Sequence, residues 1–176
     1  MKCVNFEFKA RLNDEKRIRE ALKRLDARFI GTDHQIDTYF RVPSGRLKVR
    51  QGLLENALIF YRRSNVRRAR QAAVEMMPLP RRNPLRTILA GALGTLVVVD
   101  KRREIYFVKN VKIHLDRVRQ LGKFLEVEAI SRTGDVDKIR SQARRFQELF
   151  GITAKDIIAE SYSDLILAKR ASLEGS

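Results

Sequence analysis

The chain has 176 residues, of which 37 are basic and 21 are acidic, so its formal net charge is +16. This length fits one domain with a sizeable hydrophobic core, and the excess of positive charge favours anionic partners such as nucleotides, polyphosphate, nucleic acid or a membrane surface. The single Cys3 cannot form an internal disulfide and no apolar stretch is long enough to span a bilayer, so we predict one soluble, cytoplasmic domain comprising residues 1–176.

The N-terminal half is predicted to consist mainly of strands with one helix. Alternating apolar and polar residues indicate the strands, and apolar residues three and four positions apart indicate the helix. In chain order these elements are a strand over 2–11, a helix over 14–26 capped by Asn13, and strands over 35–41, 46–51 and 57–63. The arginine-rich segment 65–70 has no apolar periodicity, which predicts an exposed loop or a strand extension.

The C-terminal half begins with Asn83 and Pro84, a pair typical of a helix start. In chain order its predicted elements are a helix over 84–92, strands over 96–100, 104–109 and 112–115, a helical turn within 116–122, a strand over 123–131, and helices over 135–150 and 163–171. About eight strands with a few helices between and beyond them indicate an α+β domain dominated by antiparallel pairing.

Charged residues recur at two-residue spacing in several predicted strands. Because strand side chains alternate between two faces, Asn5, Glu7 and Lys9 share one face, as do Glu126 and Glu128. Pairs with the same spacing that include basic residues are Lys48 with Arg50, Tyr61 with Arg63, and Lys101 with Arg103. A rolled sheet would gather these side chains in a charged lumen that could hold a polyanion and its metal ion. An ordinary antiparallel sheet with one solvated face would show the same alternation.

The sequence lacks the motifs G-x-x-x-x-G-K-S/T, G-x-G-x-x-G, G-x-S-x-G and H-E-x-x-H. Phosphate would therefore be held by side chains, with arginine and lysine as the binding groups. Mg²⁺ typically takes one or two protein carboxylates and leaves other positions for substrate phosphate. His34 and His114 have no partner at metal-ligand spacing, which favours structural roles. The candidate phosphate-binding residues are Lys9, Lys48, Arg50, Arg63, Arg70, Lys101 and Arg103, and the candidate metal ligands are Glu7, Glu126 and Glu128.

An ordered series of segments resembles a known family. The pattern N-x-E-x-K at residues 5–9 is a one-residue variant of the E-x-E-x-K signature of the CYTH superfamily, the triphosphate tunnel proteins. Residues 113–128, I-H-L-D-R-V-R-Q-L-G-K-F-L-E-V-E, resemble the I-H-L-D-x-V-x-x-L-G-x-F-x-E-x-E pattern of its class IV adenylate cyclase branch. Further similar segments are 37–40, 45–50, 58–63 and 161–165. The similarity spans about residues 4 to 167.

The resemblance implies a fold and a set of site residues. The implied fold is an antiparallel β-barrel or tunnel of about eight strands with helices packed outside. The family's metal ligands, for Mg²⁺ or Mn²⁺, match Glu7, Glu126 and Glu128, and its phosphate-binding residues match Lys9, Arg50, Arg63, Lys101 and Arg103, with Lys48 and Arg70 as additions. Asp116 and Asn5 are candidates for positioning the metal or the nucleotide. Asn5 replaces a family glutamate, which predicts weaker metal binding.

The activity implied by the resemblance is that of an adenylate cyclase, which converts ATP to cyclic AMP and pyrophosphate. One alternative is a triphosphatase that hydrolyses an organic or inorganic triphosphate, such as thiamine triphosphate or tripolyphosphate. Another is a non-catalytic binder of nucleotides, polyphosphate or RNA ends. A homodimer is compatible with these functions, no membrane partner is expected, and nucleic acid is a less favoured partner.

Overall fold

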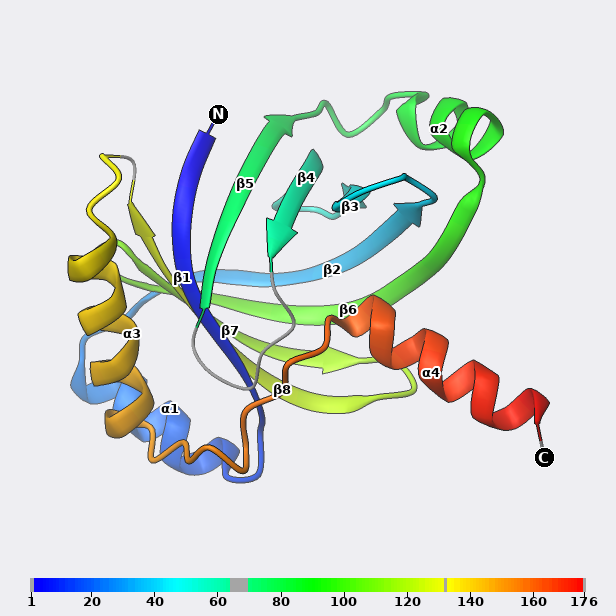
Figure 1. Ribbon diagram of the computed structural model, residues 1–176. Helices are drawn as coiled ribbons and strands as arrows, with labels where there is room; N and C mark the ends of the chain where they lie inside the picture. Colours follow the sequence, from blue (N-terminus) through cyan, green and yellow to red (C-terminus); the bar gives the residue numbers. More distant parts are fainter. Residues whose placement is uncertain (1, 64–69, 132, 176) are drawn as a thin grey trace.

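The computed structural model describes residues 2–63, 70–131 and 133–175. Within these ranges eight antiparallel strands close into a barrel and four helices lie outside it (Figure 1). The strands are β1 (Lys2–Arg11), β2 (Arg28–Phe40), β3 (Arg46–Gln51), β4 (Ala57–Arg63), β5 (Arg70–Pro78), β6 (Thr95–Val108), β7 (Val111–Val118) and β8 (Gly122–Ser131). Their order around the barrel is β1-β5-β4-β3-β2-β6-β7-β8, and the pairing of β8 with β1 completes the ring. The predicted barrel with external helices is confirmed.

One strand was absent from the sequence prediction. β5 directs Ala72, Val74 and Met76 to the lumen and Glu75 and Met77 to the outside. The inward side chains are apolar, and Met77 on the outer face is apolar too. The two faces of the strand therefore differ little in polarity, and the alternation that predicts a strand is weak. Residues 65–69 of the predicted arginine-rich segment lie outside the described residues, whereas residue 70 begins β5.

β6 and β7 are longer than predicted. The two predicted strands over 96–100 and 104–109 form the single strand β6, because Lys101 and Arg103 point into the lumen instead of interrupting the strand. The predicted helical turn within 116–122 is wrong, since Asp116 pairs with Phe124 and the strand β7 continues to Val118. At Lys101 and Arg103 buried charge gave the appearance of a break, whereas the turn was predicted from the helix-like spacing of Val118 and Leu121.

The helices are α1 (Glu15–Arg24), α2 (Leu85–Leu93), α3 (Val136–Leu149) and α4 (Tyr162–Glu174). The N-cap of α1 is Asp14, not Asn13, because the Asp14 carboxylate accepts the backbone N–H of Arg17 at 3.0 Å. Ser161 and Asp164 form a reciprocal capping box at the start of α4. Among the described helices, none has both the length and the apolar character needed to cross a membrane.

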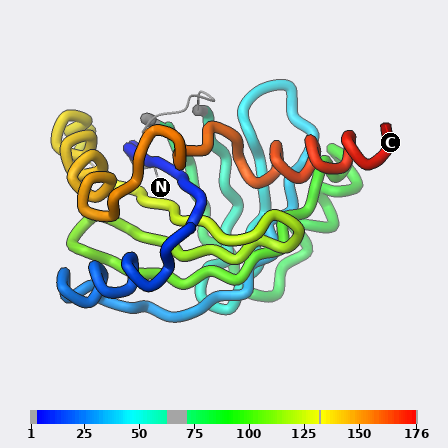
Figure 2. Tube along the Cα trace, turned by 90° about the horizontal axis from the view of Figure 1, so that it is seen from below, coloured from blue at the N-terminus to red at the C-terminus, as the bar shows by residue number. Residues whose placement is uncertain are grey.

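The hydrophobic core lies outside the barrel, between its wall and the helices. Ile18 of α1 and Phe146 of α3 pack with Phe8, Ile113 and Val127 from the outer faces of β1, β7 and β8. The helices α1 and α3 lie together at one side of the barrel and α4 extends from the other (Figures 1 and 2). Because the main core is placed outside, the lumen is available for polar side chains.

Candidate active site in the barrel lumen

The inward faces of the strands line a cavity of about 160 Å³. The pairing of β1 with β8 sets Glu7 opposite Glu128 and Lys9 opposite Glu126, so these side chains share the lumen face. The predicted site residues that line the cavity are Asn5, Glu7, Lys9, Lys48, Arg50, Lys101, Arg103, Glu126 and Glu128. The side chains of Arg63 and Arg70, which are also in the predicted set, lie outside the described part of the chain.

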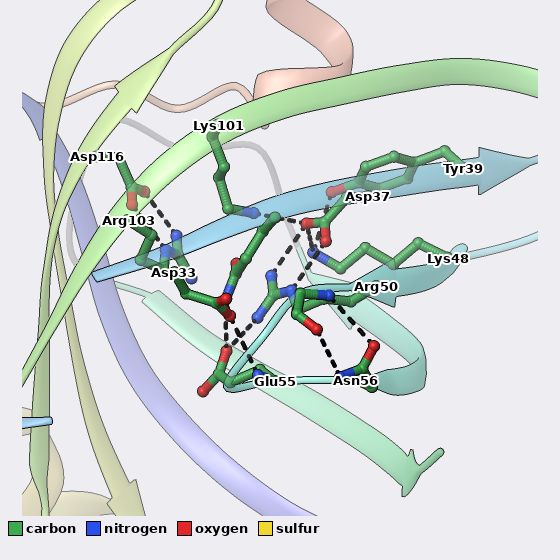
Figure 3. Close-up of polar contacts among 12 residues, drawn as sticks. Asp33, Asp37, Tyr39, Lys48, Arg50, Glu55, Asn56, Lys101, Arg103 and Asp116 are labelled. Atoms are coloured by element: carbon green, nitrogen blue, oxygen red, sulfur yellow. Dashed lines mark hydrogen bonds and ion pairs between the residues drawn. The ribbon is translucent and has the colours of Figure 1, made fainter. Parts of the chain in front are cut away.

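Three of the predicted phosphate-binding residues converge on the carboxylate of Asp37 (Figure 3). Lys48 Nζ lies 2.8 Å and Lys101 Nζ 2.6 Å from Asp37 Oδ2, and Arg50 Nε lies 2.8 Å from Oδ1. Burial alone would raise the pKa of Asp37, but the charges of Arg50, Lys101 and Lys48 hold this pKa well below its usual value. Asp37 is therefore an internal anion at the centre of the cation cluster, which we define as Lys48, Arg50 and Lys101.

Arg103 links the cation side of the lumen to its acidic side. Its guanidinium donates to both oxygens of Asp116, at 2.7 and 2.6 Å, and to Glu126 Oε2 at 2.6 Å. Tyr162 of α4 donates its hydroxyl to Asp116 Oδ2 at 2.7 Å. Asp116 is buried behind Arg103, so its direct effect on the site is to orient that guanidinium.

An acidic cluster, defined as His114, Glu126 and Glu128, occupies neighbouring positions on β7 and β8. One potential ligand atom from each residue lies within 4.8 Å of the others. His114 Nδ1 is 3.6 Å from Glu126 Oε2 and 3.8 Å from Glu128 Oε1. Within the described residues, neither buried ring nitrogen of His114 has a hydrogen-bond partner. Glu7 does not belong to this compact group, although it shares the lumen face with Glu128.

The charge states of the acidic cluster suit a divalent cation. Burial, with the Arg103 charge, lowers the pKa of His114 to about 3, so its imidazole is neutral at pH 7. Burial and the neighbouring Glu126 raise the pKa of Glu128 to about 7. A cation between these side chains would relieve the repulsion between the carboxylates and could use a ring nitrogen of His114. The donor set therefore fits a metal ion.

Glu55, in the connection from β3 to β4, also reaches into the lumen. Its carboxylate lies 2.9 Å from Arg50 and forms an ion pair with Lys112 of β7. The connection is held by Asp33, whose buried carboxylate accepts the backbone N–H groups of residues 53–55 at 2.6 to 3.1 Å. Glu55 is thus fixed as a second anion beside Arg50.

Sequence reasoning missed several of these lumen residues. Lys112 and His114 share the two-residue alternation of β7 with Asp116, and this signal could have found them. Asp37 was missed because no charged residue lies two positions away from it, although its segment is similar to the family. Glu55 was missed because it lies outside any strand. The positions of such residues depend on which strands become neighbours.

The chain matches a family of known proteins. Residues 4–162 match the CYTH domain, so the chain belongs to the CYTH domain family. A Methanocaldococcus jannaschii protein is 27% identical over 173 residues, covering 92% of this chain and 98% of that protein.

Solved structures from other organisms share the fold. The PH1012 protein of Pyrococcus horikoshii has a TM-score of 0.78 at 24% identity and covers 92% of this chain and 98% of its own. A Vibrio parahaemolyticus protein has a TM-score of 0.74 at 16% identity, and the alignment covers 92% of this chain and 97% of the Vibrio chain. The Methanocaldococcus and Vibrio proteins are described as putative adenylate cyclases. At these identities the structural likeness shows the fold alone.

Proposed function

We propose that this protein is a metal-dependent enzyme that converts ATP to cyclic AMP and pyrophosphate in the barrel lumen. The observation that carries the proposal is that the cation cluster and Arg103 line the same cavity as Glu126 and Glu128. Arginine and lysine side chains bind phosphate oxygens, and each of these cations is already held in position by a carboxylate of the chain. Membership of the CYTH family and the descriptions of two relatives support the choice of a cyclase.

The distribution of charge supports a requirement for metal. Glu126 and Glu128 would repel a triphosphate that carries no metal ion. A divalent cation between the two carboxylates would offset this repulsion. We propose that Glu126 and Glu128, with Glu7 or His114, hold Mg²⁺ or Mn²⁺. When bound, the ion supplies positive charge that offsets phosphate charge and acidifies a coordinated hydroxyl group.

The cation cluster has a separate role in this proposal. Lys48, Arg50 and Lys101 bind the β- and γ-phosphates and stabilise pyrophosphate as it leaves. Lys9 and Arg103, both in contact with Glu126, orient the phosphate nearest to the acidic cluster. The ribose 3′-hydroxyl loses its proton to water, its oxygen forms a bond to the α-phosphorus, and the bond from that phosphorus to the bridging oxygen breaks to release pyrophosphate.

Product analysis tests the proposal directly. The purified protein is incubated with ATP, tripolyphosphate or thiamine triphosphate, with and without Mg²⁺ or Mn²⁺. We expect cyclic AMP and pyrophosphate from ATP, in the presence of metal only. Release of orthophosphate would instead identify a triphosphatase, and binding without turnover would identify a non-catalytic binder.

Replacing Asn5 by Glu should lower the metal concentration needed for half-maximal activity. Asn5 lines the cavity two residues before Glu7 on the same face of β1, so the variant adds a carboxylate near the acidic side of the lumen. Activity titrations with Mg²⁺ and Mn²⁺ on the parent and the variant measure the effect. An unchanged or higher requirement would mean that Asn5 is not a weakened metal ligand.

A further inference from the structure

A row of basic side chains crosses the outer wall of the barrel. Arg102 of β6 pairs with Arg117 of β7, which pairs in turn with Lys123 of β8, and all three side chains are exposed. Lys101 and Arg103 line the cavity, so Arg102 between them points outward. Neighbouring strands lie about 4.8 Å apart, so the row spans about 10 Å. We define the cation row as Arg102, Arg117 and Lys123.

The cation row lines an outer pocket of about 180 Å³. Glu15 and Glu104 also line this pocket, but other cations hold their carboxylates. Arg19 donates to Glu104 at 2.7 and 2.8 Å, and Arg19 and Lys123 each contact Glu15 at 2.7 Å. Arg102 and Arg117 form no ion pair with any residue that the structure describes.

The facing positions of Arg102 and Arg117 favour a bound anion. Like charges directly opposite each other on neighbouring strands destabilise a sheet, and an anion between the two guanidinium groups would offset this repulsion. Phosphate fits, because each guanidinium can donate two parallel hydrogen bonds to phosphate oxygens. An arginine alone on a surface is normally hydrated, so the inference depends on the facing pair.

An exposed aromatic side chain lies farther along the same wall. Phe29 is 53% exposed, and its ring centroid lies 4.9 Å from that of Tyr106. Phe29 of β2 pairs with Tyr106 of β6, which is four residues from Arg102 on the outward face of that strand. At about 3.4 Å per residue, the two rings are about 14 Å from the cation row. Phe29 therefore offers a surface on which a nucleic-acid base can stack.

We propose that this outer wall binds a single strand of nucleic acid, with its backbone phosphates on the cation row and a base stacked on Phe29. The ligand is extended, because one phosphate group cannot reach both the row and the ring. A duplex keeps its bases stacked on one another, so it cannot use Phe29. The net charge of +16 would attract the strand before it docks.

The outer wall is the opposite face of the sheet from the lumen, so the inference does not depend on the proposed function. A suitable probe is a labelled oligo(dT) of about 12 nucleotides with a 5′-hydroxyl group, a length within the usual size of single-strand sites. It has no triphosphate, so it does not report on triphosphate binding in the lumen. Fluorescence anisotropy at about 50 to 200 mM salt measures the affinity and its salt dependence.

The double variant Arg102→Gln, Arg117→Gln should bind the oligonucleotide at least about tenfold more weakly at low salt. Each phosphate contact contributes about 0.7 to the slope of log affinity against log salt for a single strand, so this slope should fall by about 1.4. Phe29→Leu should weaken binding by about fivefold or more and leave the slope unchanged, because it removes only the stacking surface.

The matched control is Arg144→Gln, Arg145→Gln, because both residues are exposed on α3 and neither lines the outer pocket. It removes the same charge from the chain and should bind close to the parent. Without a ligand, the Arg102 and Arg117 double variant should melt no lower than the parent, since it removes a repulsive pair. This melt checks that weaker binding does not come from unfolding.

Several outcomes would overturn the proposal. An equal loss in the two double variants would show that only the net charge attracts the strand. Equally tight binding of a duplex, or of a glutamate-rich peptide with the same charge, would show that the wall does not select a single strand of nucleic acid. Parental binding by Phe29→Leu would remove the base from this position, and a parent that does not bind at about 50 mM salt would remove the site altogether.

Discussion

Replacing Glu126 by Gln should reduce metal-dependent turnover by about 100-fold or more while leaving the barrel folded. The amide keeps the size of the side chain but removes a negative charge from the acidic cluster, where Glu126 lies 3.6 Å from His114. It also removes one of the two charged acceptors of Arg103, whose guanidinium is 2.6 Å from Glu126 Oε2 and also donates to Asp116. Cyclic AMP formation at saturating and limiting Mg²⁺ measures the loss, and circular dichroism checks the fold.

The control for this substitution is Glu148→Gln, an exposed residue on α3 that lies outside the cavity. It makes the same chemical change at the surface and should keep parental turnover. Glu128→Gln should behave like Glu126→Gln, since Glu128 completes the acidic cluster. Full activity of both lumen variants at low Mg²⁺ would show that these carboxylates do not hold the metal.

The sequence predicts best those strands whose two faces differ strongly in polarity. β1, β3 and β4 have the predicted boundaries, because their alternating residues end at recognisable turns. Alternation alone could not close the sheet. Whether β1 pairs with β5 and β8 is decided by contacts between residues far apart in the chain. The family resemblance supplied the expectation of a barrel or tunnel but no strand pairing, and β5 was not predicted as a strand.

The site could be predicted where charges repeat at two-residue spacing and not elsewhere. Lys101 and Arg103 were found in this way, and both line the cavity. Asp37 and Glu55 were not found, because the cations that they bind come from different strands or from beyond a turn. The roles of the predicted residues in binding metal and phosphate stay predictions.

Replacing Asp37 by Asn should lower the free energy of unfolding by about 3–5 kcal/mol when no anion is added. Asp37 is 1% exposed and its carboxylate is the shared partner of Lys48, Arg50 and Lys101. Without its charge, Lys48, Arg50 and Lys101 lose their shared acceptor. Burial, with the charges of Arg50, Arg103 and Lys48, already holds the pKa of Lys101 well below its usual value, and this pKa falls further because Asp37 is the charge that raises it. Urea unfolding of the parent and the variant measures the difference. The control Asp100→Asn, whose carboxylate lies 2.7 Å from the exposed imidazole of His34 on the outer wall, should cost about 1 kcal/mol or less.

The same substitution should make stability depend more strongly on tripolyphosphate. An anion at a hundredfold excess over its Kd stabilises a protein by about 2.7 kcal/mol, and a lumen that has lost its internal anion should bind this ligand more tightly. Tripolyphosphate should therefore recover more stability in Asp37→Asn than it adds to the parent. If tripolyphosphate stabilises the variant less than the parent, Asp37 positions the side chains of the cation cluster for phosphate binding and does not compete with phosphate for them. If it stabilises neither protein, Lys48, Arg50 and Lys101 are not the phosphate site.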